Sequence, residues 1–233
     1  MSVLALKKQA EKVSNDMARL NGHRRKSTKL ELLPWVRKFI TLRQESFDLD
    51  GHEYLADIYT DPTPFEVYRK AAQVGISTKC LLEAIWLCDK YHGKVLYYMA
   101  TDTDADEFAN DRINTVIDDC NYLTQLAQER ERGRDNVRLR HIAKGSLYCR
   151  GMFTKGKVKS VDADMIILDE LDEADQENKR FAYDRILHSK LQMVRELSQP
   201  SIPDYGIDET YQKTDQRYWN LKCSACNKWT CLD

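Results

Sequence analysis

Strand-like and helix-like segments alternate along the middle of this chain, and this alternation limits the possible folds more than any other feature. The helix signals are apolar residues at helical spacing, and the strand signals are short apolar or alternating runs. The expected strands are 65–72, 94–100, 137–143 and 165–168, and the expected helices are 77–90 and 103–127. This order predicts an α/β fold with a mostly parallel central sheet flanked by helices.

The segments before and after this region differ in character. The first 47 residues contain few Gly or Pro and have helix-like apolar spacing in Leu30–Phe39, which predicts a helical N-terminal extension. Asp57–Pro64 has turn chemistry and is expected to be a connection. We therefore expect an extension over 1–47, a core over 48–218 and a Cys-containing segment over 219–233.

The formal net charge of −1 conceals a strong separation of charge. Residues 1–43 contain eleven Lys and Arg against three acids, so the rest of the chain is acidic. Such a basic arm could contact DNA phosphates or an acidic partner, and an ordinary solvated helix surface is the alternative. No apolar run approaches the roughly 18 residues of a membrane span, so no membrane partner is expected. Seven cysteines, an odd number, suit a reducing compartment better than a disulfide framework.

A candidate phosphate-binding loop lies between the first strand and the first helix of this pattern. Arg69–Lys79 reads RKAAQVGISTK. A phosphate loop needs small residues that let backbone N–H groups turn inward, a Lys and a Ser or Thr at the helix start. Gly75 and Ser77 fit the standard pattern, but Ile76 occupies its Lys position and Lys70 stands at its first Gly. A strand–turn–helix junction without nucleotide is the alternative.

A pair of carboxylates ends the last apolar run, about ninety residues after the loop. The segment Met165–Glu170 reads MIILDE. In additional-strand ATPases the Asp at this position holds Mg²⁺ and the adjacent Glu polarises the attacking water. An acidic helix cap is the alternative, because Asp162–Glu177 is acidic throughout. The two segments in this order favour a P-loop NTPase.

At this point the sequence resembles a known family. Lys70–Ser77 is similar to the deviant Walker A motif of the large terminase subunits of tailed phages, in the lambda-like branch, where the Lys precedes the loop. Further segments agree with this family in order along the chain. They are Lys94–Thr103 after the first helix, Lys144–Gly151 before Walker B, the Walker B segment LDELDEAD, Ser198–Ser201 at the coupling motif, and Thr214–Tyr218 with Cys223-x-x-Cys226 at the exit from the core.

The resemblance implies a RecA-like (ASCE) P-loop NTPase fold and a role for each motif residue. Glu170 would be the catalytic glutamate, and Asp169 and Ser77 would hold Mg²⁺. Lys70 would neutralise phosphate charge, while Arg69 would either sense the γ-phosphate or pair with the acidic segment Val161–Asn178. The nucleotide-binding loop would comprise Lys70, Ala71, Ala72, Gln73, Val74, Gly75, Ile76, Ser77 and Thr78. The coupling motif would be Ser198, Gln199, Pro200 and Ser201, where Gln199 replaces the usual Thr.

The resemblance also implies a motor that uses ATP to pump double-stranded DNA into a procapsid in the cytoplasm of an infected bacterial host. Its partners would be the DNA, the terminase small subunit, the portal protein and further copies in a ring, with a monomer expected in isolation. The nuclease that follows the motor in this family is not expected here. Cys223 and Cys226 have the spacing of half a Zn²⁺ site. The competing hypotheses are a non-catalytic DNA- or partner-binding module with a degenerate loop, and another translocating or helicase-type ATPase.

Overall fold

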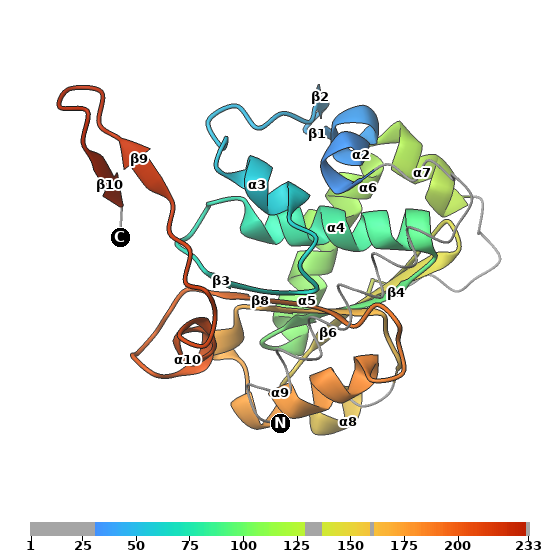
Figure 1. The fold of residues 1–233 in the computed structure, drawn as a ribbon. Helices are drawn as coiled ribbons and strands as arrows, with labels where there is room; N and C mark the ends of the chain where they lie inside the picture. The colour runs from blue at the N-terminus through green and yellow to red at the C-terminus, as the bar shows by residue number, and fades with distance from the viewer. Residues whose placement is uncertain (1–30, 129–136, 159–160, 232–233) are drawn as a thin grey trace.

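The protein is built around a six-stranded sheet that is parallel except at one edge. The computed structural model describes residues 31–128, 137–158 and 161–231. The strand order is β3-β8-β7-β4-β6-β5, and only β5 runs antiparallel to its neighbour (Figure 1). The strands are β3 (Phe65–Arg69), β8 (Met193–Ser198), β7 (Met165–Asp169), β4 (Lys94–Met99), β6 (Gly145–Gly151) and β5 (Leu139–Ile142). The predicted α/β class with a mostly parallel sheet is confirmed.

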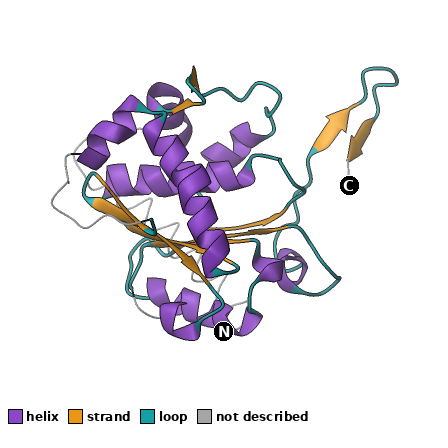
Figure 2. Ribbon diagram, turned by 180° about the vertical axis from the view of Figure 1, so that it is seen from behind, coloured by secondary structure: helices purple, strands orange, loops and turns teal. Residues whose placement is uncertain are grey.

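Helices cover both faces of this sheet, as Figure 2 shows from behind. The first face carries α2 (Leu32–Phe39), α3 (Leu55–Thr60), α4 (Ile76–Tyr91), α5 (Asp102–Phe108), the π-helical η1 (Ala109–Asn114), α6 (Thr115–Asp118) and α7 (Asn121–Gln128). The second face carries α8 (Lys155–Val158), α9 (Gln176–Tyr183) and α10 (Gly206–Tyr211), with the 3₁₀ turns η2 (Leu171–Glu173) and η3 (Asp184–Ile186). None of the described helices is long and apolar enough to cross a membrane.

Alternation along the central strands divides the apolar core into two clusters. In β4, Val95 and Tyr97 belong to the cluster beneath α4, and Leu96 and Tyr98 belong to the cluster beneath α9. This follows from strand geometry, because successive side chains point to opposite faces of a sheet. Central strands of the sheet are therefore buried on both sides, as the apolar sequence of β7 requires.

The N-terminal extension is helical only in part. Residues 1–30 lie outside the described ranges. Helix α2 follows, and its fully buried Trp35 donates an indole hydrogen bond of 2.9 Å to Asp89 of α4. The predicted helix does not continue to Phe47, because β1 (Thr41–Leu42) and β2 (Glu45–Ser46) form a hairpin. Arg43 and Gln44 at its tip have positive φ, which ends a helix.

Three other sequence expectations need correction. The expected connection at Asp57–Pro64 begins inside α3. The expected helix at 103–127 is divided among α5, η1, α6 and α7. Strands β6 and β8 were not predicted as strands at all, and β8 lies in the middle of the sheet. Its sequence MVRELS contains two charged residues, but every one of its residues is buried.

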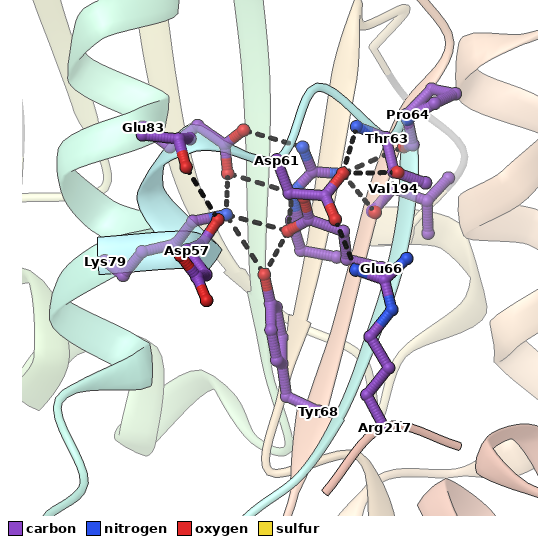
Figure 3. Close-up of polar contacts among 12 residues, drawn as sticks. Asp57, Asp61, Thr63, Pro64, Glu66, Tyr68, Lys79, Glu83, Val194 and Arg217 are labelled. Carbon is purple, nitrogen blue, oxygen red and sulfur yellow. Dashed lines mark hydrogen bonds and ion pairs between the residues drawn. The ribbon is translucent and has the colours of Figure 1, made fainter. Parts of the chain in front are cut away.

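A cluster of buried charges joins β3, α4 and β8 beneath the first face of the sheet. Lys79 of α4 lies 2.7 Å from Glu66 and 2.9 Å from Glu83, and it also hydrogen-bonds to Tyr68 (Figure 3). Arg195 of β8 lies 2.6 Å from Glu83 and 2.9 Å from Glu66. The cluster therefore contains two positive and two negative side chains, each at most 8% exposed.

Burial and pairing act in opposite directions on the two carboxylates of this cluster. Burial alone raises the pKa of Glu83, but the charges of Arg195 and Lys79 outweigh it and lower the pKa to about 2. For Glu66 burial prevails, so its pKa is raised despite the same two cations. The cluster is electrically balanced only while all four groups are present. Removing one partner leaves an uncompensated charge in the interior.

We therefore expect Lys79→Met to lower the free energy of unfolding by about 3–5 kcal/mol, because two buried carboxylates would then share one guanidinium. Urea denaturation followed by circular dichroism measures this change. The exposed Lys190 provides the matched control, and Lys190→Met is expected to change stability by less than about 0.5 kcal/mol. Equal stability of the two variants would contradict the assigned role of the cluster.

Candidate active site

The segments singled out in the sequence meet at one edge of the sheet, at the carboxyl ends of three neighbouring parallel strands. The candidate phosphate loop follows β3, the Ser198–Ser201 segment ends β8, and Asp169 and Glu170 end β7. Ligands of open α/β sheets bind at such an edge. Strand β8 lies between the loop strand and the carboxylate strand, as an additional-strand topology requires.

The loop before α4 turns tightly and is contacted by residues in and just before α3. Gly75 has φ +78°, and a Cβ at this position would lie 2.9 Å from Leu55 of α3. The Tyr54 hydroxyl donates a 2.8 Å hydrogen bond to the carbonyl of Val74. Gln73 also has a positive φ, of 60°. The backbone thus turns sharply into the N-terminus of α4, where free N–H groups favour an anion.

Lys70 reaches the carboxylates at the end of β7 although it stands in front of the loop. Its amino group lies 3.0 Å from Glu170 Oε1 and 3.9 Å from Asp169 Oδ1. Its backbone N–H donates to the carbonyl of Ser198, which fixes the start of the loop against β8. The side chain is only 9% exposed. A lysine at this position therefore places its charge in the centre of the site.

Asp169 is a buried carboxylate that accepts a hydrogen bond from a tyrosine of the neighbouring strand. It is 2% exposed, and the Tyr97 hydroxyl of β4 donates a 2.7 Å hydrogen bond to its Oδ2. Burial raises the pKa of Asp169, while the hydrogen bonds from Tyr97 and Ser77 and the charge of Lys70 act against this rise. Ser77 thus lies near Asp169, and a metal held by both residues stays a prediction. Tyr97 orients the carboxylate from the neighbouring strand.

Glu170 has an unusual backbone for a residue of its type. Its φ and ψ of 51° and 47° lie in the left-handed region. A non-glycine residue there costs about 1–3 kcal/mol and persists only where the surroundings hold it. The turn leaves the carboxylate partly exposed beside Lys70. Glu170 therefore lies at the surface of the site, whereas Asp169 lies beneath it.

Arg69 points away from Lys70 and contacts the segment around α10. Its guanidinium lies 2.8 Å from Asp208 and 4.5 Å above the ring of Tyr211, and it reaches the hydroxyl of Tyr218. The backbone N–H of Asp204 and the side chain of Arg69 lower the pKa of Asp208. The expected pairing of Arg69 with the acidic segment 161–178 is wrong, because its partner is Asp208 in α10. A γ-phosphate-sensing role stays a prediction.

The expected coupling segment is hydrogen-bonded to the turn after Glu170. Ser198 is buried, and its hydroxyl accepts a 3.2 Å hydrogen bond from the backbone N–H of Asp172. Ser201 donates both its N–H and its hydroxyl to Asp172 Oδ2, each at 2.7 Å. Gln199 and Pro200 are exposed. This geometry places the segment beside Glu170, and its coupling role stays a prediction.

The two paired cysteines lie outside this site. Cys223 and Cys226 belong to the hairpin of β9 (Asn220–Lys222) and β10 (Trp229–Cys231), which extends away from the sheet (Figure 1). Backbone N–H groups of Cys226 and Ala225 lower the pKa of Cys223. Within the described residues no three His, Cys, Asp or Glu side chains come together as metal ligands, so Zn²⁺ is not supported.

The oxygen atoms at the phosphate loop suit a different metal. A carboxylate and a hydroxyl, Asp169 and Ser77, fit a hard cation such as Mg²⁺ that keeps waters and binds phosphate oxygens as its other ligands. The N–H groups at the start of α4 and the positive charge of Lys70 fit a phosphate group at this edge of the sheet. The arrangement can therefore bind a nucleoside triphosphate with its metal.

Three residues of the site were missed from sequence: Tyr97, Asp172 and Asp208. Tyr97 was predicted only as part of a buried strand, and the one available signal was a polar hydroxyl inside an apolar run. Asp172 and Asp208 are acids in acidic stretches, where one carboxylate cannot be told from the next. Their partners lie far along the chain, so no local pattern identifies them.

The hydrogen bond from Tyr97 gives a direct test of the geometry around Asp169. Because a hydrogen bond to the ionised carboxylate lowers its pKa, Tyr97→Phe should raise the pKa of Asp169 further. A pH titration of the carboxyl ¹³C shift of Asp169 measures it. Tyr98→Phe is the control, since the Tyr98 hydroxyl donates to the carbonyl of Val158 on the other face. An unchanged titration in Tyr97→Phe would contradict this contact.

The comparison with protein families agrees with this geometry. The family model described as phage terminase large subunit gpA, ATPase domain, matches residues 55–233. A comparison with curated proteins gave no significant match. The matched region contains the whole six-stranded sheet and the phosphate loop, and the terminase ATPase domain has the RecA-like fold expected above. The chain therefore belongs to the ATPase-domain family of the phage terminase large subunits of the gpA type.

Proposed function

We propose that this chain is the ATP-hydrolysing motor domain of a phage DNA-packaging terminase and couples hydrolysis to the movement of double-stranded DNA into a procapsid. Membership of the family supports a packaging-motor ATPase in general. The observation that carries the proposal is the position of Lys70. Its amino group lies beside both carboxylates at the end of β7, although the sequence lacks the usual loop lysine.

Binding of the triphosphate would use the loop and the start of α4. Backbone N–H groups of the loop and of the first turn of α4 would donate to phosphate oxygens, and Lys70 would neutralise their charge. Ser77 and Asp169 would hold Mg²⁺, which supplies further charge neutralisation to the phosphates. Thr78 provides a second hydroxyl in this turn.

Glu170 would orient the attacking water and accept its proton. Without nucleotide, Glu170 is the ion-pair partner of Lys70 at 3.0 Å. A phosphate that binds Lys70 would compete with this carboxylate for the ammonium group and draw it away, because the triphosphate carries more negative charge than one carboxylate. Glu170 would then be free to face the water. The Lys70–Glu170 ion pair would therefore hold the Glu170 carboxylate away from its role as base until ATP binds.

The motor would work with the partners that the family implies. These are double-stranded DNA, the terminase small subunit, the portal protein and further copies of this chain in a ring, acting in the cytoplasm of the infected host. The basic arm of residues 1–43 offers positive charge for phosphate contacts. The Ser198–Ser201 segment would transmit the state of the nucleotide, since it ends β8 between the loop and Glu170.

Nucleotide binding tests this proposal first. Isothermal titration calorimetry with ATP and Mg²⁺ should detect binding by the wild-type chain and a loss of affinity of about tenfold or more in Lys70→Ala, because a charge-assisted contact to phosphate is removed. Lys190→Ala, a change at an exposed lysine, should bind as the wild type does. Absence of binding by the wild type would reject the motor function.

Turnover tests the role of Glu170. With the chain in excess over ATP, Glu170→Gln should bind nucleotide like the wild type and hydrolyse it about 10²–10⁴-fold more slowly, because the general base is lost. The exposed Glu177 gives the control, and Glu177→Gln should keep the wild-type rate. Equal rates for Glu170→Gln and the wild type would show that another group is the base.

A further inference from the structure

Asp172, two residues after Glu170, connects three separate segments of the chain. Its Oδ2 accepts hydrogen bonds from the N–H and the hydroxyl of Ser201, both at 2.7 Å. Its Oδ1 accepts the backbone N–H of Ile207 in α10, also at 2.7 Å. Its own N–H donates to the hydroxyl of Ser198. One side chain thus joins the turn η2 to the end of β8 and to the start of α10.

The backbone around Asp172 is shaped for this carboxylate. Gly206, before Ile207, has φ +55°, and a Cβ there would lie 2.3 Å from Asp172 Oδ1. A side chain at this position would displace the carboxylate or the start of α10. Three donors converge on two oxygens that carry a negative charge, and such charge-assisted hydrogen bonds are stronger than neutral ones.

Helix α10 is also connected to the phosphate-loop strand. Asp208, the residue after Ile207, lies 2.8 Å from Arg69, which directly precedes Lys70. Lys70 in turn is paired with Glu170. The contacts therefore close a ring that runs from Glu170 through Asp172, α10 and Arg69 to Lys70 and back to Glu170. Helix α10 thus contacts both Asp172, two residues after Glu170, and Arg69, one residue before Lys70.

Glu170 needs support of this kind. Its left-handed backbone is strained, and such a conformation persists only where neighbouring contacts fix it. The backbone N–H of Glu170 bonds its neighbour Asp169, and the backbone N–H of Glu173 bonds the carbonyl of Glu170. These local contacts lie within the turn itself. Asp172 is the residue that anchors the turn to other segments, at Ser198, Ser201 and Ile207.

We propose that Asp172 is a positioning residue for ATP hydrolysis, which holds the turn after Glu170 against Ser198–Ser201 and α10. It keeps the Glu170 carboxylate where the attacking water binds. This inference rests on the proposed ATPase function. Loss of Asp172 lowers the rate at which bound ATP is hydrolysed. It leaves the affinity for ATP unchanged, because Lys70, Ser77 and the loop amides remain in place.

The test compares Asp172→Asn with wild type by calorimetry and by single-turnover hydrolysis with the chain in excess. The substitution keeps the shape of the side chain but turns one acceptor into a donor that faces N–H groups. A misplacement of about 1 Å in an active site costs roughly 10²-fold, so the hydrolysis rate should fall by about this factor while the dissociation constant for ATP with Mg²⁺ stays unchanged. Asp162→Asn is the matched control in the same acidic stretch, since Asp162 is exposed and should leave the rate unchanged.

A milder variant covers the case in which Asp172→Asn does not fold. Ser201→Ala removes only one hydroxyl hydrogen bond to Asp172 and should slow hydrolysis by roughly 3- to 10-fold with unchanged affinity. The positioning role would be overturned if every folded variant of the two hydrolysed ATP at the wild-type rate. It would also be overturned if a variant lost affinity for ATP but kept the wild-type hydrolysis rate. If the wild type itself neither binds nor hydrolyses ATP, the motor function fails instead, so the two failures are distinguishable.

Discussion

The contact between Lys70 and the carboxylates at the end of β7 is the interaction on which the site depends. It joins residues one hundred positions apart, Lys70 and Glu170. The contact exists because β3 and β7 run parallel with β8 between them, so their carboxyl ends meet at one edge of the sheet. A lysine in front of the loop reaches this edge directly from its own strand. Under the proposed function, Lys70 would take the role of the lysine that is missing at Ile76.

A cluster of buried charges connects β3, α4 and β8, which lie next to the site. Glu66 on β3, Lys79 and Glu83 on α4, and Arg195 on β8 form one buried ion cluster. These elements carry the phosphate loop, the helix that follows it and the Ser198–Ser201 segment. Such buried clusters contribute little net stability compared with apolar packing, but losing one member is costly. Their position suggests that they fix how β3, α4 and β8 fit together, and a change at any member disturbs all three.

The sequence predicts those parts of the fold and the site that have a signal within a short stretch of neighbouring residues. Asp169 and Glu170 end an apolar strand, Gly75 and Ser77 begin a helix, and both segments lie at one edge of the sheet; their roles stay predictions. Strand β8 was missed because Arg195 and Glu196 make it look exposed. Both are buried, Arg195 against Glu83 on one face and Glu196 against Lys179 and Tyr183 on the other. Those partners lie elsewhere in the chain, so the strand's own sequence does not show that its charges are paired.

The central claim is that Lys70 and Glu170 exchange partners when a nucleotide binds. A crystal structure of the chain with Mg²⁺ and a non-hydrolysable ATP analogue tests it most directly. We predict that the Lys70 amino group contacts a phosphate oxygen, that Glu170 no longer pairs with Lys70, and that Ser77 and Asp169 lie beside the metal. An analogue bound elsewhere, with the Lys70–Glu170 pair intact at 3.0 Å, would contradict the account.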